Sequence, residues 1–185
     1  MSGFRGIRQG SVQNGYFDNF SEGYPGQIAT RPDVSLVDSF PAETLVLAGI
    51  GGAKGADLTL TADKYNNLVA PNKVKTPDAA TTAADFVGIA VRDNSTPTNA
   101  DGNPEYPEDN LVPVIREGRV FVEANVAIAP GDDVWLIVQD TTTHGFKIGS
   151  FVNADLGGGD TVQITGATFW KAAAAGDVAI IELGR

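Results

Sequence analysis

The sequence predicts an all-β protein, because three of its features favour many short strands joined by tight turns. Glycine is frequent, with 22 residues in a chain of 185, and 10 prolines accompany it. Apolar and β-branched residues come in short runs of strand length. No apolar pattern with a period of 3.6 residues extends far enough for a long amphipathic helix. We therefore expect a single compact β-barrel or β-sandwich that carries an extended N-terminal arm.

The pattern divides the chain into an N-terminal arm, residues 1–26, and a β-rich domain, residues 27–185. The arm is rich in glycine and polar residues, and its apolar residues follow neither a strand period nor a helix period. Its spaced aromatic side chains are typical anchors for a groove on another protein. The residues expected to make these contacts are Phe4, Tyr16, Phe17, Phe20 and Tyr24. The alternative is a disordered tail, which is common at chain termini.

The first part of the domain predicts several short strands. They are expected at residues 27–37, 44–50, 57–61 and 86–91. Pro32 favours an edge position for the first of them, because proline cannot donate a hydrogen bond to a neighbouring strand. The glycine cluster from Gly49 to Gly55 predicts the loop of a hairpin. Residues 62–84 predict a loop, with a short helical turn at 81–85.

The second part predicts a more regular arrangement. The polar stretch 93–109 predicts a long loop, and such loops tend to be functional or mobile. A strand–turn–strand–turn–strand meander is then expected, with strands at 111–115, 119–126 and 134–138 and turns at Glu117-Gly118 and Pro130-Gly131-Asp132. Further strands are expected at 146–151, 161–164, 167–171 and 177–183, and the last of them closes the sheet.

Charge and composition exclude several classes of function. The net charge is −10 and the isoelectric point is about 4.4, so the chain repels nucleic-acid phosphates and anionic membranes. The absence of cysteine removes disulfides, thiolate catalysis and thiolate zinc sites, and it suits synthesis in a reducing cytoplasm. No apolar run approaches the roughly 20 residues that span a bilayer, and no signal-peptide core follows Met1. We expect a protein that binds neither nucleic acid nor membranes.

The glycine cluster does not satisfy the requirements of a nucleotide site. A phosphate-binding loop needs Gly-Lys followed by Ser or Thr at the start of a helix, whereas Lys54 here precedes Gly55. Lys54 also stands where a dinucleotide-binding fingerprint needs its third glycine, and no βαβ unit follows. The sequence therefore predicts no nucleotide and no other cofactor.

The loop at 93–109 partly resembles a calcium loop of the EF-hand type. Gly102 and Glu108 fall at the sixth and twelfth positions, but the first position is Pro97, which offers no side-chain oxygen. Flanking helices are also missing. A solvated acidic loop is the favoured interpretation and no metal is predicted. The alternative is calcium binding by Asp101, Glu105, Glu108 and Asp109.

Catalytic candidates are few. His144 lies in a polar turn without a Ser or Asp constellation, and the sequence contains no Gly-x-Ser-x-Gly motif. Asp132 and Asp133 follow Pro-Gly and suit a turn better than acid–base chemistry. Trp135 and Trp170 are expected as core or half-core residues rather than as a platform for carbohydrate stacking. We predict that the protein is not an enzyme.

Six segments, in their order along the chain, resemble a family of tailed-phage virion proteins, the structural cement or head-decoration proteins. They are YPGQIA (24–29), FVGIAVR (86–92), GRVFV (118–122), GDDVW (131–135), GATFW (166–170) and AAGDVAIIEL (174–183). The resemblance spans about residues 24–185, and residues 1–23 look like an addition to the pattern.

The resemblance implies a small β-rich protein that binds the exterior of the expanded phage head and reinforces it against internal pressure. Its implied partners are the major capsid protein and further copies of itself, as a trimer or dimer, with the arm reaching one of them. It is expected in the virion, after synthesis in the host cytoplasm. The alternatives are another virion component, from the tail, neck or head fibre, or a carbohydrate-binding module that uses Trp135 or Trp170.

Overall fold

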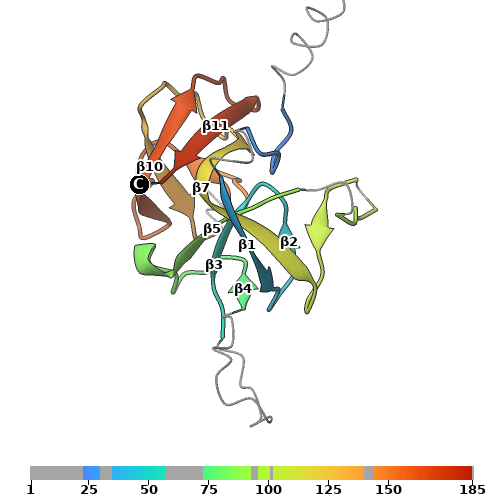
Figure 1. The fold of residues 1–185 in the computed structure, drawn as a ribbon. Coiled ribbons are helices and arrows are strands. Elements are labelled where there is room, and N and C mark those ends of the chain that lie inside the picture. The colour runs from blue at the N-terminus through green and yellow to red at the C-terminus, as the bar shows by residue number, and fades with distance from the viewer. Residues whose placement is uncertain are drawn as a thin grey trace, which may run out of the picture.

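The computed structural model describes residues 23–29, 35–56, 73–92, 96–100, 102–139 and 144–184. In these ranges strands predominate, and the helical content is the 3-10 turn η2 (Ala83–Asp85), where the sequence predicts a short helical turn. The prediction of an all-β protein is confirmed. The main sheet curls strongly, so that its two halves lie at different levels of the molecule (Figure 1).

The strands in chain order are β1 (Leu36–Pro41), β2 (Val46–Leu47), β3 (Gly51–Lys54), β4 (Val74–Lys75), β5 (Phe86–Ala90), β6 (Glu105–Tyr106), β7 (Leu111–Glu123), β8 (Asp133–Ile137), β9 (Phe151–Val152), β10 (Thr161–Lys171) and β11 (Val178–Leu183). The main sheet has the order β4-β3-β5-β7-β11-β10-β8-β9, and β1 also pairs with β7. β2 and β6 form a separate two-stranded sheet.

β7 is a single strand of 13 residues, so the predicted turn at Glu117-Gly118 is wrong. Its first half pairs with β1 and β5, and its second half pairs with β11. Gly118 has a φ of +117°, and the ladder with β1 shifts register between Leu36 and Val37. Glycine reaches positive φ without a steric penalty, so the chain bends at Gly118 and continues instead of reversing.

The predicted meander is also wrong in its strand order. β7 and β8 are separated by β11 and β10, which form a hairpin inserted between them. The turn at Pro130-Gly131-Asp132 does form, but its backbone bonds to β10: Gly131 N–H donates to the Phe169 carbonyl oxygen at 2.7 Å, and Phe169 N–H donates to the Asp132 carbonyl oxygen at 3.0 Å. A local turn thus forms without dictating which strands become neighbours.

Part of the glycine cluster forms a strand, which contradicts the predicted hairpin loop. Only Gly49, with a φ of +84°, lies in a turn, and Gly51–Lys54 is β3, paired with β4 and β5. A Cβ on Gly51 would lie 2.5 Å from Leu136 Cδ1, and one on Gly52 would lie 2.6 Å from Val74 Cγ2. These glycines therefore permit close packing of the strand against the core.

The predicted strands at 161–164 and 167–171 are one strand, β10, and the predicted loop at 93–109 contains the strand β6. Gly166 has a φ of +81° and lies in the region where the β8–β10 register shifts, so it marks a bulge. In the loop, β6 pairs with β2, and buried Tyr106 donates its hydroxyl to the Val91 carbonyl oxygen. The strands predicted near 86–91 and 177–183 are present as β5 and β11.

Two apolar clusters fill the curled sheet. The larger cluster has residues from β5, β7 and β8–β11, and the smaller one has residues from β1, β2, β4, β5, β6 and the first half of β7. Val120 and Val122 of β7 enter the larger cluster, whereas Val112 and Val114 enter the smaller one. β7 therefore joins two cores.

Candidate interaction surfaces

The N-terminal segment Gly23–Ala29 lies along the second half of β7 (Figure 1). Gly26 N–H donates to the Phe121 carbonyl oxygen at 2.8 Å, and Ala29 N–H donates to the Arg119 carbonyl oxygen at 2.7 Å. Ile28 packs against the larger core. The predicted arm boundary, between residues 26 and 27, falls within this segment.

Tyr24 is the one predicted contact residue that the described ranges include. Its side chain is 40% exposed, and the Arg92 guanidinium carbon lies 4.7 Å from the centre of its ring. Arg92 is tied to the same segment, because its N–H donates to the Gly26 carbonyl oxygen at 2.8 Å. Phe4, Tyr16, Phe17 and Phe20 lie outside the described residues.

The outer face of the sheet carries an unusual group of side chains on β7, β11 and β10. Residues that lie opposite each other on neighbouring strands have their side chains on the same face of the sheet. Arg119 lies opposite Glu182, and Phe121 lies opposite Ile180, so these four side chains share one face. Gly23 crosses the ring of Phe121 so closely that an added Cβ would lie 2.4 Å from it. The N-terminal segment thus enters the domain over this outer face.

Trp170 is the exposed centre of this face. It follows Phe169 where the β10–β11 register shifts, and 48% of it is exposed, so of the predicted core and half-core positions it can hold only the second. The Arg119 guanidinium carbon lies 4.0 Å from the centre of a Trp170 ring. Arg119 also donates from Nε and Nη2 to Glu182 Oε1, at 3.2 and 3.1 Å. Trp135, by contrast, is half-buried in β8.

We call this surface the Trp170 face. It comprises Gly23, Arg119, Phe121, Trp170, Ile180 and Glu182. Trp170 could be singled out from the sequence, whereas its neighbours on this face were missed. A signal was present for Glu182, because it stands between the apolar residues Ile181 and Leu183, both buried, and so had to point away from the core.

A second apolar surface lies along β1 and the start of β7. Leu111, 64% exposed, is opposite Pro41, and Leu36 and Val37 are also exposed. Arg116 Nη1 and Asp38 Oδ2 form an ion pair at 3.1 Å beside them. We call this the β1 surface.

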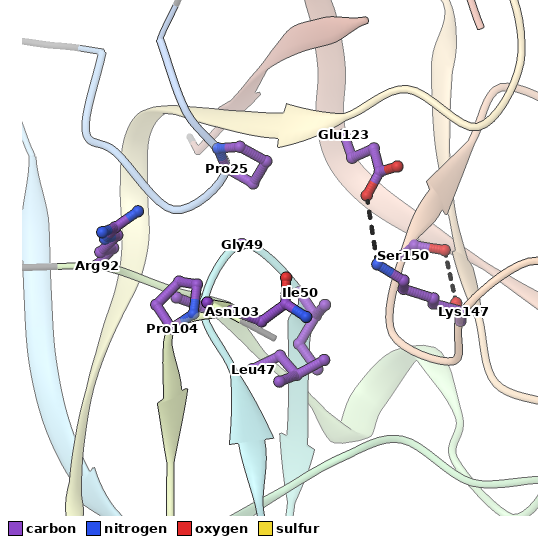
Figure 2. A pocket seen from close by; sticks show the side chains of 12 residues that line it. Pro25, Leu47, Gly49, Ile50, Arg92, Asn103, Pro104, Glu123, Lys147 and Ser150 are labelled. Atoms are coloured by element: carbon purple, nitrogen blue, oxygen red, sulfur yellow. Dashed lines mark hydrogen bonds and ion pairs between the residues drawn. The ribbon is translucent and has the colours of Figure 1, made fainter. Parts of the chain in front are cut away.

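A cavity of about 250 Å³ lies beside the N-terminal segment (Figure 2). It is lined by Pro25, Leu47, Ala48, Gly49, Ile50, Arg92, Gly102, Asn103, Pro104, Glu123, Lys147 and Ser150. Lys147 Nζ and Glu123 Oε2 form an ion pair at 3.8 Å on one side, away from Arg92 on the other. The charged groups do not converge on one point, so the cavity has no arrangement suited to acid–base chemistry.

His144 and Asp132, the residues considered for catalysis, make contacts that suit a structural role. His144 is exposed and stacks on Phe146, with ring centres 5.5 Å apart. Asp132 accepts hydrogen bonds from Asn153 Nδ2 and from Ala129 N–H, both at 2.8 Å, and the Asn153 bond contributes most to lowering the pKa of Asp132. Asp132 therefore stabilises its turn, as predicted.

The candidate calcium ligands are not gathered around one point in the part of the chain that the structure describes, where no group of three or more His, Asp or Glu residues could hold a metal ion. Asp109 Oδ1 pairs with Lys73 Nζ at 2.8 Å, and Glu105 accepts a bond from Asn99. Asp101 lies outside the described residues. No described helix has the length and apolar character needed to cross a membrane.

Residues 12–184 match the model of the family described as "Structural cement protein (E217 gp24/Pam3 gp6)". The chain belongs to this family of phage structural cement proteins. The family match begins at residue 12, within the predicted arm. The resemblance of individual motifs begins later, at residue 24. This cement protein is thus a structural protein of a phage capsid, as the motifs implied.

The fold of the cement protein is similar to that of a chain in "The capsid of Myoviridae Phage XM1". The TM-score is 0.63 at 16% identity, and the similarity covers 89% of this chain and 91% of the other. A chain in "The crystal structure of head fiber gp8.5 N base in bacteriophage phi29" has a TM-score of 0.37 at 14% identity, covering 81% of this chain and 94% of that one, which is too low to support an argument. A search of curated proteins finds no match.

Proposed function

We propose that this cement protein binds the outer surface of the phage capsid, without catalysis, and holds neighbouring major capsid proteins together. The observation that carries the proposal is the family match over residues 12–184. We further propose that the protein acts as a homo-oligomer, a dimer or a trimer, since symmetric shells favour symmetric contacts. Many identical weak contacts over a shell add by multivalency, so no single contact has to be strong.

The charge of the chain supports an exterior position. Its 23 acidic residues outnumber its 13 basic ones, which gives a net charge of −10. A protein of this charge is repelled by packaged DNA, because like charges raise the free energy of close approach. The outer surface of the shell is the position that avoids this repulsion.

The polar contacts support a purely structural role. Asp78, Asp132 and Asp155 each accept hydrogen bonds, and those from Lys75, Asn153 and Gly157, respectively, contribute most to lowering the pKa of the carboxyl group. Groups held in this way as stable carboxylates are poor proton donors near neutral pH. Their role is to order turns.

The arm is proposed to extend the contact beyond the folded domain. The aromatic residues proposed to anchor it are Phe4, Tyr16, Phe17, Phe20 and Tyr24. Tyr24 supports this role, since it is exposed and its ring stacks with Arg92 at the point where the chain enters the domain. Large aromatic side chains provide much contact area at a low cost in conformational entropy.

The test is to mix the purified protein with expanded heads that lack it and to locate it by cryo-electron microscopy. Density on the outside of the shell, in hundreds of copies per particle, is expected. Density confined to the tail, neck or a fibre, or no binding at all, would contradict the proposal. A variant without residues 1–22 is expected to remain folded and to occupy fewer sites, and unchanged occupancy would remove the arm from the contact.

A further inference from the structure

We propose that the Trp170 face is the part of the folded domain that docks on a shell subunit. This inference rests on the proposed function and deepens it by naming the surface and the chemistry of the site that receives it. The receiving site on the shell subunit would be an uncharged apolar recess that accepts the indole of Trp170.

The residue types of the Trp170 face are those that dominate protein interfaces. Trp, Tyr and Arg are enriched among the few residues that carry most of the binding free energy. Trp170 is 48% exposed, although it lies on a sheet face whose neighbouring residues Phe121 and Ile180 are buried. A large, exposed indole on an otherwise covered apolar row is well placed to insert into a partner.

The Trp170 face is ordered before it binds. Arg119 is held between the ring of Trp170, at 4.0 Å, and Glu182 Oε1, at 3.1 Å. A side chain fixed in this way loses little rotamer freedom on docking, so more of the contact energy remains as affinity. The long Arg119 side chain also limits the positions open to the indole.

The charges of this face indicate the chemistry of the partner. Arg119 and Glu182 satisfy each other, so covering them leaves neither charge without a counter-ion. The receiving surface therefore needs no charge of its own at its centre. A recess lined by apolar side chains and backbone fits this requirement, whereas a strongly charged surface would leave its own charges unpaired.

The course of the chain indicates which partner this is. Gly23 lies over Phe121 on the same face, so the 22 preceding residues are joined to the domain at this point. Fully extended, they reach at most about 75 Å, which is enough to follow a neighbouring subunit over much of its surface. Because the arm and Trp170 start from one face, one partner can receive both.

The β1 surface is the competing site. Its exposed apolar residues, Leu36, Val37 and Leu111, are aliphatic, and Arg116 beside them is paired with Asp38. Leucine and valine are under-represented among residues that dominate binding. Leu111 is therefore a suitable control, since it is even more exposed than Trp170.

The experiment measures binding of the full-length protein to expanded heads that lack it, by co-sedimentation. The variants are Trp170→Ala, Thr168→Arg and the control Leu111→Ala. Thr168 is exposed and lies opposite Glu182, so an arginine there adds bulk and positive charge to the Trp170 face. Thermal unfolding of each variant establishes that it is folded.

We expect both Trp170→Ala and Thr168→Arg to bind about tenfold more weakly or worse, as for an interface anchor, and Leu111→Ala to bind like the parent protein. Folded variants of the Trp170 face that bind normally would overturn the inference. A loss of head binding in Leu111→Ala alone would also overturn it. If the variants of the Trp170 face lost self-association but kept head binding, the face would instead bind a second copy of the protein. Failure of the parent protein to bind heads would instead contradict the proposed function.

Discussion

The two halves of the curled sheet are built in different ways from one strand. The second half of β7 joins the long β10–β11 hairpin, whose buried side chains, among them Phe169, Ala179 and Ile181, enter the larger core. The first half of β7 joins short strands from distant parts of the chain, among them β3 with its glycines. The half that contains β10 and β11 is stabilised by side chains that fill a core. The half that contains β3 and β5 depends on backbones that approach each other closely.

The largest effect is expected where a side chain fills the larger core. Phe169 is 1% exposed, and Phe169→Ala should lower the free energy of unfolding by about 3–5 kcal/mol, because it removes a buried ring and leaves a cavity. Chemical denaturation followed by tryptophan fluorescence measures this.

The same variant tests whether the two cores unfold together. Since β7 belongs to both, a single transition is expected at a lower midpoint. The matched variant Val112→Ala in the smaller core should shift the same transition by less. Two separate transitions would show that the halves are independent.

A smaller effect is expected where the other half depends on close backbone approach. At Gly88 of β5, φ is +149° and an added Cβ would lie 2.3 Å from the Ile115 carbonyl oxygen. Gly88→Ala should therefore lower the free energy of unfolding by about 2–3 kcal/mol.

Gly131→Ala is the matched control for this variant. Gly131 also has a positive φ, +88°, but nothing lies within 4 Å of an added Cβ. Gly131→Ala should lower the free energy of unfolding by only about 1 kcal/mol, because the alanine adds backbone strain and no steric clash. Equal losses for the two variants would mean that the close approach of β5 to β7 contributes nothing beyond strain.

The smallest effect is expected at Asp132, in the turn directly before β8. Hydrogen bonds from Asn153 and Ala129 lower the pKa of Asp132 in the folded protein below its ordinary value of 3.8. Its stabilising contribution is therefore complete above that ordinary value and is lost as the pH falls through the folded pKa.

Asp132→Asn should thus lower the unfolding temperature slightly at neutral pH, and the gap to the parent protein should narrow as the pH falls below about 4. Thermal unfolding across this range checks the sign. A gap that widens on acidification would rule out this role for the carboxylate.

The elements that could be predicted are those whose signals are local. β5 and β11 have β-branched apolar runs, and the turn at Pro130-Gly131-Asp132 and η2 follow from short-range preferences. The continuous β7 could not be predicted, because Glu117-Gly118 has the same local preference for a bend as for a reversal. The strand β3 was missed because glycine favours loops unless the neighbouring backbones and side chains lie too close for any other residue.

The Trp170 face shows the same division. The sequence alone determined an acidic, cysteine-free, all-β protein, and its ordered motifs identified the phage cement family, since composition, local runs and turns depend only on near neighbours. Only the tertiary structure decided that Arg119, Glu182 and Trp170, from three different strands, form one exposed face. The reason is that strand order and register depend on long-range pairing, which balances the packing of two cores at once and leaves no mark in any single segment.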